Sequence, residues 1–355
     1  MRILQVATSS LRRGAEVFAA QLGSELGRRG HEVTTISLEH RNGEHGLAFE
    51  ELAVPGRGPR AVLELARRAR ACDVLIAHGG STLLPVAIAA KLARRPFVYR
   101  NIGDPSFWGR SRGAALRIGA PLRSAAQVVA LYPDAADYMR EHYRLPDERL
   151  VVAPNAVDVD RFAAATSAQR RSVRAELSLP PTQIVLGYLG NLSEEKRPGW
   201  ALATVEALED ATLLMAGDGP LRAELDQRAR SLGTRESTPA CRLLGPVSDP
   251  QRFLAAIDVL LLPSATEGIP GVLVEAALVG VPTVATDVGG VRDALTTMSA
   301  GVCVPVDDFD GFVAAVRGVA ADPGGYRPDR DAALEHHAIE AVADRWEQVV
   351  LQVGG

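Results

Sequence analysis

The chain has 355 residues, a length that predicts two domains at roughly 100–200 residues each. Hydrophobic residues make up 47% and charged residues 23%, which is typical of a folded globular protein and excludes wholesale disorder or a coiled coil. No apolar run approaches the roughly 18 residues of a membrane span, and the opening apolar stretch is too short for a secretory signal. Three cysteines in such a chain fit a reducing cytoplasm rather than a disulfide framework, so we expect a cytoplasmic protein.

The formal net charge of −4 is unevenly distributed along the chain. Residues 1–165 hold 23 Lys and Arg against 17 Asp and Glu, whereas residues 166–355 hold 16 against 26. Either the two halves meet different ligands, or these charges form a solvated surface without a target. Only Lys91 and Lys196 are lysines among the 39 basic residues, a preference for arginine that is typical of a GC-rich genome. A lysine retained in that background marks its surroundings as a candidate site.

Short apolar runs alternate with amphipathic stretches through the first half, which predicts an α/β domain with a mostly parallel sheet. The expected strands are Ile3–Ala7, Val33–Leu38, Val74–Ala77, Pro96–Tyr99, Gln127–Leu131 and Leu150–Ala153. The expected helices are Ala15–Arg29, Pro59–Ala71, Ser81–Ala93, Arg110–Ser124 and Asp134–Tyr143. The strands are near-continuous apolar runs, as expected where helices cover both faces of the sheet.

The alternation stops at Pro154–Ser178, which is polar and predicted to be irregular, and then resumes. Further strands are expected at Ile184–Leu189, Thr212–Ala216, Arg242–Leu244, Val259–Leu262, Thr283–Thr286 and Val302–Pro305. Helices are expected at Pro198–Leu208, Pro220–Leu232, Pro250–Ala256, Gly271–Val279 and Gly311–Ala321, followed by one amphipathic stretch at Arg330–Val353. The prediction is therefore an α/β fold of two tandem Rossmann-like domains, 1–165 and 166–335, whose parallel sheets face a central cleft. A C-terminal helix, 336–355, is expected to pack back on the first domain.

Ligands of doubly wound folds bind beyond the carboxyl ends of the strands, so the residues that follow each strand are the candidates. After Ile184–Leu189 the chain reaches Lys196 and Arg197, directly before Pro198. Proline favours the first turn of a helix, so both cations lie where the helix dipole disfavours them. A bound phosphate would remove that conflict; a solvated basic pair beside two glutamates is the alternative.

A second candidate loop follows the strand Val259–Leu262 and contains Glu267, with Glu275 inside the next helix. The helix begins near Gly271, where free backbone N–H groups can hold an oxyanion. Carboxylates accept paired hydrogen bonds from diols, so Glu275 suits a ribose and Glu267 a sugar ring. Two exposed glutamates are the alternative, but they leave the position of Glu275 on an otherwise apolar helix unexplained.

Other features of the sequence are weaker signals. Gly14 follows the first strand and permits close approach of a ligand to the backbone, and the loop 217–220 is a common strand-to-helix turn. A complete G-x-G-x-x-G and a Walker loop are both absent from the sequence. The pair Asp158 and Asp160 lies in the interdomain linker, and His336–His337 has no further metal-ligand partner at a useful spacing. No metal site is therefore predicted.

Taken together, these motifs resemble the family 4 (group 1) retaining glycosyltransferases of GT-B fold, over nearly the whole chain. The E-x7-E element of that family is matched by Glu267–Glu275. The stretch that follows, 276–290, also resembles the family. Weaker matches are Gly217–Pro220, Pro154–Asp158, Gly14–Glu16 and Arg29–Val33. Each motif alone is weak, but their order and spacing together are specific.

The resemblance implies roles for individual residues of this chain. Lys196 would neutralise a diphosphate, Glu275 would hold ribose hydroxyls and Glu267 would contact the donor sugar. The other residues expected on the donor side are Gly14, Asn191, Arg197, Leu244, Gly245, Gly271, Val272 and Leu273. Leu244 and Gly245 would lie near the base, while Gly14 and the stretch Gly271–Leu273 would offer backbone N–H groups to phosphate.

The chain departs from the family pattern at three positions. Asn191 stands where the family often has arginine, and Arg13 where a Gly-Gly pair is common. Ile102 lies at or beside a histidine that usually contacts the donor sugar, and Asn101 or Asp104 would have to take over that contact on the acceptor or sugar side. The last departure raises the question of which sugar is used and whether activity is retained.

The expected function is therefore transfer of a sugar from a nucleotide-diphosphate sugar to an acceptor hydroxyl with retention, in a cytoplasmic bacterial enzyme. A UDP-sugar is favoured and a GDP-sugar is an alternative; no metal or other cofactor is expected. Two other functions remain open: a catalytically silent nucleotide-sugar-binding partner of another transferase, and a GT-B-type sugar-nucleotide epimerase.

The expected partners are the nucleotide sugar and a small-molecule, glycan or lipid-linked acceptor, with no nucleic acid. Basic residues gather in two segments of the first half, which favours an anionic acceptor or peripheral contact with the inner, anionic face of a membrane; a soluble acceptor is equally compatible. Those residues are Arg57, Arg60, Arg67, Arg68, Arg70, Arg110, Arg112, Arg117 and Arg123.

Overall fold

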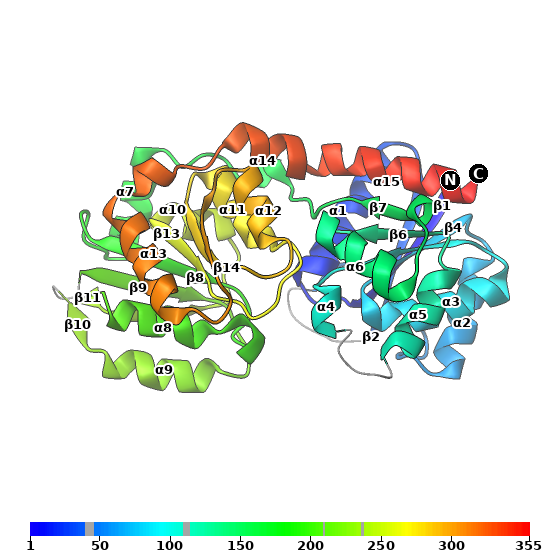
Figure 1. Ribbon diagram of the computed structural model, residues 1–355, viewed down its shortest axis with the longest axis horizontal. Coiled ribbons are helices and arrows are strands. Elements are labelled where there is room, and N and C mark those ends of the chain that lie inside the picture. Colours follow the sequence, from blue (N-terminus) through cyan, green and yellow to red (C-terminus); the bar gives the residue numbers. More distant parts are fainter. Residues whose placement is uncertain (40–45, 109–113, 209, 236–237) are drawn as a thin grey trace. The chain divides into compact units, whose positions relative to one another are not determined.

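The computed structural model describes residues 1–39, 46–108, 114–208, 210–235 and 238–355. It divides into two compact units (Figure 1), and each is described by itself. Unit 1 comprises Met1–Val157 and His336–Gly355, and unit 2 comprises Asp158–Glu335. The division thus falls at residues 157 and 158, eight residues before the expected boundary, and the C-terminal helix groups with unit 1.

Unit 1 is built on a seven-stranded sheet in the order β3-β2-β1-β4-β5-β6-β7, with every pair parallel. Its strands are β1 (Arg2–Ser9), β2 (Glu32–Glu39), β3 (Glu50–Glu51), β4 (Val74–His78), β5 (Phe97–Arg100), β6 (Gln127–Ala130) and β7 (Leu150–Val152). The helices are α1 (Gly14–Arg28), α2 (Pro59–Ala69), α3 (Gly80–Ala93), α4 (Pro105–Trp108), α5 (Ala114–Ser124), α6 (Pro133–Tyr143) and α15 (Ile339–Gly354).

Helices cover both faces of this sheet, which explains why its central strands are apolar on both sides. Leu65 of α2, Val86 of α3 and Met139 of α6 belong to the core on one face. Phe18 of α1 and Trp346 of α15 belong to the core on the other face, and α1 and α15 pack together. The predicted helix at Arg110–Ser124 is described only from Ala114, because residues 110–113 lie outside the described part of the chain.

Unit 2 has a six-stranded parallel sheet in the order β12-β9-β8-β13-β14-β15 and an antiparallel pair, β10 with β11. The strands are β8 (Ile184–Leu189), β9 (Ala211–Ala216), β10 (Thr234–Arg235), β11 (Thr238–Pro239), β12 (Cys241–Gly245), β13 (Val259–Leu262), β14 (Thr283–Thr286) and β15 (Gly301–Val304). The helices are α7 (Ser167–Glu176), α8 (Pro198–Glu206), α9 (Arg222–Ser231), α10 (Pro250–Ala256), α11 (Gly271–Val279), α12 (Val291–Thr297), α13 (Phe309–Ala321) and α14 (Arg330–His337), the last crossing into unit 1 at His336.

The prediction of irregular structure at Pro154–Ser178 was wrong, because helix α7 occupies Ser167–Glu176. Its start is stabilised by a capping box in which Thr166 and Gln169 bond each other's backbone N–H groups. The helix then buries Arg174, whose guanidinium pairs with Asp258. Charged residues facing the domain interior hide the apolar periodicity by which such a helix is recognised.

The stretch Arg330–Val353 is two helices rather than one. The chain is extended at Ala338, which forms a bridge with Val157, and α15 starts directly afterwards. In the part of the chain that the structure describes, no helix is both long enough and apolar enough to cross a bilayer.

Candidate functional site

Two of the predicted residues meet directly in unit 2. Lys196 lies in a short 3-10 turn after β8, and Glu267 lies in the loop after β13, a neighbouring strand of the sheet. The Lys196 Nζ donates to Glu267 Oε2 over 2.7 Å. A backbone bond of 2.7 Å from Ala265 N–H to the carbonyl of Glu195 joins the two loops. The strand order thus brings together a cation and a carboxylate that are 71 residues apart in sequence.

The carboxylate of Glu267 is fixed by a third side chain that the sequence had not singled out. Ser264 Oγ donates to Glu267 Oε1 over 2.7 Å, so each carboxylate oxygen has a partner. The Glu267 side chain is only 9% exposed, whereas that of Lys196 is 27% exposed. The pair therefore has one buried member and one that reaches solvent. Ser264 could have been found by its place directly beyond a buried strand.

Helix α11 begins at Gly271, preceded by Pro270 in an extended conformation. Leu273 N–H bonds the carbonyl of Pro270, and its side chain is fully buried. The N–H groups of Gly271 and Val272 belong to the first turn, where a helix supplies no partner. Leu273 thus contributes to the core, while Gly271 and Val272 leave two donors at a positive helix end.

The Glu275 carboxylate bends back toward this helix start. A Cβ added at Gly271 would lie 3.7 Å from Glu275 Oε1, so the two groups are neighbours. Burial raises the pKa of Glu275 to about 7, and the nearby guanidinium of Arg161 lowers it only in part. Arg161 was not predicted as a site residue; it lies just after the linker motif Pro154–Asp158.

Arg197 and Asn191 are placed differently from Lys196. The Arg197 guanidinium turns to the loop after β15, where it donates to Asp307 Oδ1 over 2.8 Å and to the carbonyl of Val306. It also lies over the ring of Trp200, 5.0 Å from the centroid. Asn191 is exposed, and its backbone carbonyl accepts the hydroxyl of Tyr188. Lys196, and not Arg197, is therefore the cation turned toward Glu267.

The loop 217–220 packs tightly against the loop after β8. A Cβ at Gly217 would lie 1.8 Å from the carbonyl oxygen of Gly190, and the φ of Gly217 is +138°. A Cβ at Gly219 would lie 2.5 Å from the carbonyl oxygen of Leu192. Glycine is required at both positions because the backbones touch, so this motif first of all sets the position of the Asn191 loop.

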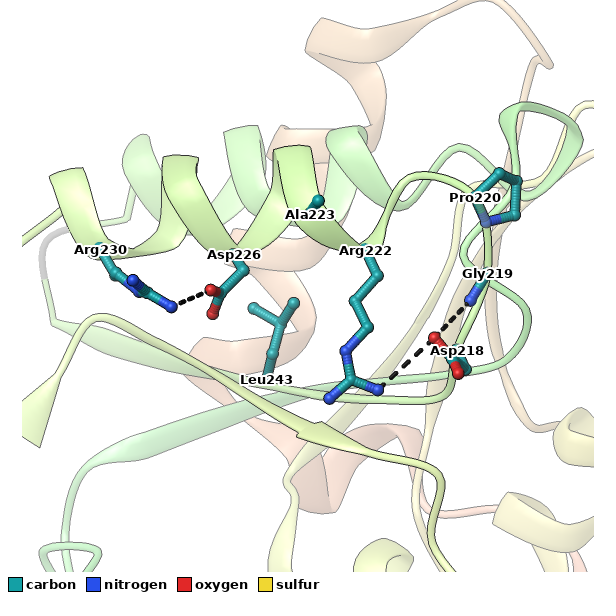
Figure 2. Close-up of a pocket in the computed structure, with 8 residues that line it drawn as sticks. All are labelled: Asp218, Gly219, Pro220, Arg222, Ala223, Asp226, Arg230 and Leu243. Carbon is teal, nitrogen blue, oxygen red and sulfur yellow. Dashed lines mark hydrogen bonds and ion pairs between the residues drawn. The ribbon is translucent and has the colours of Figure 1, made fainter.

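A hollow of about 580 Å³ opens beside this glycine loop (Figure 2). It lies between the start of α9 and β12, and Figure 2 shows Arg222 extending from the helix toward Asp218, at 3.5 Å. The predicted base-side residue Gly245 adjoins it, because a Cβ there would meet the Arg222 guanidinium at 3.3 Å. Leu244 is half-buried next to it. Arg222 and Asp218 are thus polar groups beside the predicted residue Gly245 that sequence reasoning had not selected.

The predicted residues of unit 1 are mostly occupied by their own loops. Asn101 Oδ1 accepts the N–H of Gly103 over 3.0 Å, and Asp104 accepts the N–H and hydroxyl of Ser106. Ile102 packs on Gly79, where an added Cβ would lie 2.5 Å from Ile102 Cδ1. Gly14, in contrast, has open space, with no atom within 4 Å of an added Cβ.

A buried polar cluster behind this loop was missed by the sequence analysis. Arg100 is 1% exposed, donates to Asn155 Oδ1 over 2.5 Å and lies 3.7 Å over the ring of Phe18. His78 lies 3.3 Å from the Arg100 Nη1 and bonds Gln5 over 2.8 Å. Burial lowers the pKa of Arg100 to about 9 and holds the pKa of His78 well below its usual value. An arginine ending an apolar strand was the available signal.

The remaining residues named from the sequence are His337 and the basic residues of unit 1. His337 Nδ1 bonds the carbonyl of Asn155, and no group of three or more His, Cys, Asp or Glu at metal-binding distance occurs among the described residues. Arg57 pairs with Glu39, and Arg68 with Glu50. Arg110 and Arg112 lie outside the described residues, as does the side chain of Arg117.

Two profiles of known families match consecutive parts of the chain. Residues 12–161 match Glycosyltransferase Family 4, and residues 183–322 match Glycosyl transferases group 1. The chain belongs to this family of glycosyltransferases, and the predicted GT-B class of two parallel α/β domains is confirmed.

Curated relatives are similar over parts of the chain. The chain is 30% identical over 244 residues to a 2-deoxystreptamine glucosyltransferase of Streptomyces kanamyceticus, which covers 64% of this chain and 62% of the relative. A D-inositol 3-phosphate glycosyltransferase of Geodermatophilus obscurus is 31% identical over 56% of this chain and 46% of its own length. The chain thus spans about half to three fifths of these two relatives.

Longer matches come at lower identity. A GDP-mannose-dependent phosphatidylinositol dimannoside mannosyltransferase of Mycobacterium tuberculosis is 28% identical over 92% of this chain and 90% of its own. The crystal structure of Anabaena Alr3699/HepE in complex with UDP and glucose superposes with a TM-score of 0.84 at 20% identity, covering 98% of this chain and 99% of the other. At that identity the structural likeness concerns the fold.

Proposed function

We propose that the protein is a retaining glycosyltransferase that moves a sugar from a nucleoside-diphosphate sugar to an acceptor hydroxyl without a metal ion. The observation that carries the proposal is the Lys196–Glu267 pair, 2.7 Å apart beyond neighbouring strands, in a unit whose helix α11 also has free N–H groups. A cation and a helix N-terminus together suit a diphosphate. Family membership supplies the reaction class.

In this proposal unit 2 holds the donor. Lys196 and the N–H groups of Gly271 and Val272 bind the diphosphate, and Glu275 accepts hydrogen bonds from the ribose hydroxyls. Glu267, fixed by Ser264, contacts the donor sugar. Arg197 supports the site by holding the loop after β15 through Asp307, and Asn191 lines the same edge.

The chemical step breaks the bond between the sugar C1 and the diphosphate oxygen and forms a bond from C1 to the acceptor oxygen on the same face. The acceptor's hydroxyl proton passes to the departing diphosphate, so that atoms and charge balance. Positive charge on the sugar and negative charge on the leaving group both grow in the transition state. Lys196 and the helix end stabilise the leaving group, and the Glu267 carboxylate lies on the side of the sugar.

The base of the nucleotide is assigned to the hollow beside Arg222, next to Leu244 and Gly245. A UDP-sugar is the first candidate, because the Anabaena protein was solved with UDP and UDP-glucose. A GDP-sugar is the second, named for the mycobacterial relative. The test is competition between the two donors in wild type and in Arg222→Ala.

The acceptor is assigned to unit 1, where Gly14 after β1 keeps its expected role of offering a backbone N–H to the donor phosphate and has open space around it. Relatives act on a cyclitol, 2-deoxystreptamine, or on a diphosphoundecaprenol-linked sugar, so we propose a cyclitol, sugar or lipid-linked sugar hydroxyl. Asn101 and Asp104 act through the shape of their loop, because their side-chain oxygens already accept bonds from it.

A second candidate, a catalytically silent nucleotide-sugar-binding partner, is favoured by Ile102 packed on Gly79, where the family often has histidine. Measuring the release of nucleoside diphosphate with and without an acceptor distinguishes the transferase, the epimerase and the silent partner. Release that requires an acceptor, with the sugar recovered on it, supports the transferase. Formation of an epimerised sugar from the nucleotide sugar without any acceptor indicates an epimerase. Binding without turnover indicates the silent partner.

A further inference from the structure

The outward face of α3 is apolar, which is unusual for a helix on a protein surface. Leu84, Ile88 and Leu92 follow one another at four-residue spacing and are 52%, 43% and 48% exposed. Residues at that spacing share one face of a helix. The opposite face, including Val86 and Ala89, is fully buried in the core of unit 1. A helix apolar all round is expected in a core or a membrane, not beside water.

Helix α2 extends this surface. It packs beside α3 and buries Leu65 and Ala66 in the same core cluster, so the outer faces of both helices point away from the sheet. Leu63 on the outer face of α2 is 51% exposed. The two helices are also joined at their ends, where Arg95 Nη2 donates to the carbonyl of Arg70 over 3.1 Å. Figure 1 shows α2 and α3 side by side in unit 1.

The exposed charged residues of α2, α3 and the turns that follow them are all basic. The exposed basic residues of the two helices and the turn after α3 are Arg60, Arg67, Arg70, Lys91 and Arg94. Helix α3 contains no Asp or Glu. The single acidic residue of α2, Glu64, is half-buried and accepts the N–H groups of Ala53 and Val54. We call these five basic residues, with Leu63, Leu84, Ile88 and Leu92, the α2–α3 face.

We propose that the α2–α3 face docks unit 1 onto an anionic lipid bilayer. The four apolar side chains enter the boundary between headgroups and acyl chains, and the five cations lie among the anionic headgroups. The proposal rests on the surface of unit 1 and does not depend on the donor chemistry. It narrows the expectation drawn from the sequence: Arg60, Arg67 and Arg70 remain in it, whereas Arg57 and Arg68 are engaged by Glu39 and Glu50.

The composition of the face favours a bilayer over a protein partner. Protein interfaces are enriched in aromatic residues and depleted of lysine at their centre, whereas this face has no aromatic residue and has Lys91 between Ile88 and Leu92. A symmetric contact with a second copy would bring five cations against the same five. An anionic bilayer is complementary both to the apolar side chains of the face, through its acyl chains, and to the cations, through its headgroups.

The test uses the full chain and vesicles of phosphatidylcholine with or without 30–40% phosphatidylglycerol, a composition on the order of an anionic bacterial leaflet. Cosedimentation is measured at low and at high salt. We expect binding to the anionic vesicles only, decreasing with salt. The variant L84Q/I88Q/L92Q is expected to bind at least about tenfold less. In the variant R60Q/R67Q/R70Q, the affinity for anionic vesicles is expected to fall about fivefold for each charge removed, and most of its salt dependence is expected to disappear.

Leu351→Gln is the matched control, because Leu351 is an exposed leucine (49%) on α15 of the same unit. It should bind vesicles as wild type does, and all variants should melt within a few degrees of wild type. The proposal is overturned if the wild-type protein does not cosediment with anionic vesicles at low salt. It is also overturned if the apolar triple variant binds unchanged. A wild-type dimer that this variant converts to monomer would assign the face to a second copy instead.

Discussion

The loops beyond the sheet of unit 2 and those beyond the sheet of unit 1 use their polar residues differently. In unit 2, Lys196 and Glu267 from two loops meet, and the first turn of α11 has N–H groups to which the helix itself gives no partner. In unit 1, Asn101 and Asp104 satisfy their own loop, and Ile102 fills the space at Gly79. In unit 2 a cation and a carboxylate from two loops thus meet, whereas in unit 1 the side chains of Asn101, Ile102 and Asp104 are used within their own part of the unit.

In the proposed function, that difference divides donor and acceptor binding between the units. A diphosphate needs cations and N–H donors, which unit 2 supplies at one sheet edge. An acceptor hydroxyl needs mainly a position, which a rigid loop supplies. Substitutions that affect charge should therefore matter most in unit 2, and substitutions in the unit 1 loop should have smaller effects.

The largest effect is expected for Lys196→Ala. Removing the cation from the leaving diphosphate should lower kcat by about 10²–10³, by analogy with loss of one oxyanion-hole donor. The measurement is the steady-state rate of nucleoside diphosphate release. Arg171→Ala is the control, because Arg171 is an exposed cation on α7 of the same unit and should retain wild-type activity. Equal rates in the two variants would refute the role of Lys196.

Glu275→Gln should change the pH dependence of nucleotide binding. Burial raises the pKa of Glu275 from 4.5 to about 7, so its carboxylate is ionised only above that pH. Wild-type affinity should fall as pH drops from 8 to 6, because a protonated carboxyl loses an acceptor for the ribose. The variant should bind about tenfold more weakly at pH 8, with a flat profile. A sloping profile in the variant would assign the titration to another group.

The same substitution has a consequence for stability. Between pH 4.5 and about 7 the folded protein holds a proton that the unfolded chain has lost, so folding stability falls as pH rises through this window. Glutamine has no ionisable carboxyl, so Glu275→Gln abolishes this pH-dependent loss of folding stability. The variant should therefore be more stable than wild type above pH 7 by about 2–3 kcal/mol. Urea unfolding at pH 5 and pH 8 measures the difference. A variant no more stable than wild type at pH 8 would contradict the raised pKa.

Arg222→Ala tests the base side of the nucleotide site. The guanidinium lies over Gly245 and lines the hollow, so its loss should weaken nucleotide binding about tenfold while leaving phosphate binding unchanged. Affinities for the nucleoside diphosphate and for pyrophosphate provide the comparison. Equal weakening of both ligands would place Arg222 on the phosphates instead.

Asp104→Ala should have the smallest effect on activity. The Asp104 carboxylate caps the short helix α4 by accepting from Ser106, so its loss should cost about 1 kcal/mol of stability. We expect kcat to change less than tenfold, measured beside the melting temperature. A loss as large as that of Lys196→Ala would show that unit 1 takes part in the chemistry by charge, and the contrast between the units would fail.

Much of the fold could be predicted because both sheets are buried on both faces. The apolar runs Val74–Ala77 and Val259–Leu262 mark two of the strands, and glycine or proline begins helices such as α8 and α11. Helix α7 was missed because its inward side chains include Arg174, whose half-buried partner Asp258 lies 84 residues away. The short strands β10 and β11 have only two residues each and leave no periodic signal.

For the site, the sequence singled out Lys196 and Glu267 in loops that follow strands, and Glu275 in the helix after one of those loops. It could not pair them, because the contact between Lys196 and Glu267 depends on β13 lying beside β8. Ser264 and Arg222 were missed for the same reason, since their importance comes from what they touch. The orientation of Arg197 toward Asp307 is likewise a tertiary property.

The central claim is that unit 2 binds a nucleoside diphosphate through Lys196. It is tested most directly by calorimetric titration of the protein with UDP, GDP, ADP and dTDP, in wild type and in Lys196→Ala. The account predicts binding of one nucleotide by the wild type, with UDP the first candidate, and at least about tenfold weaker binding by the variant. Equal affinity in the two proteins, or no binding of any nucleotide, would contradict it.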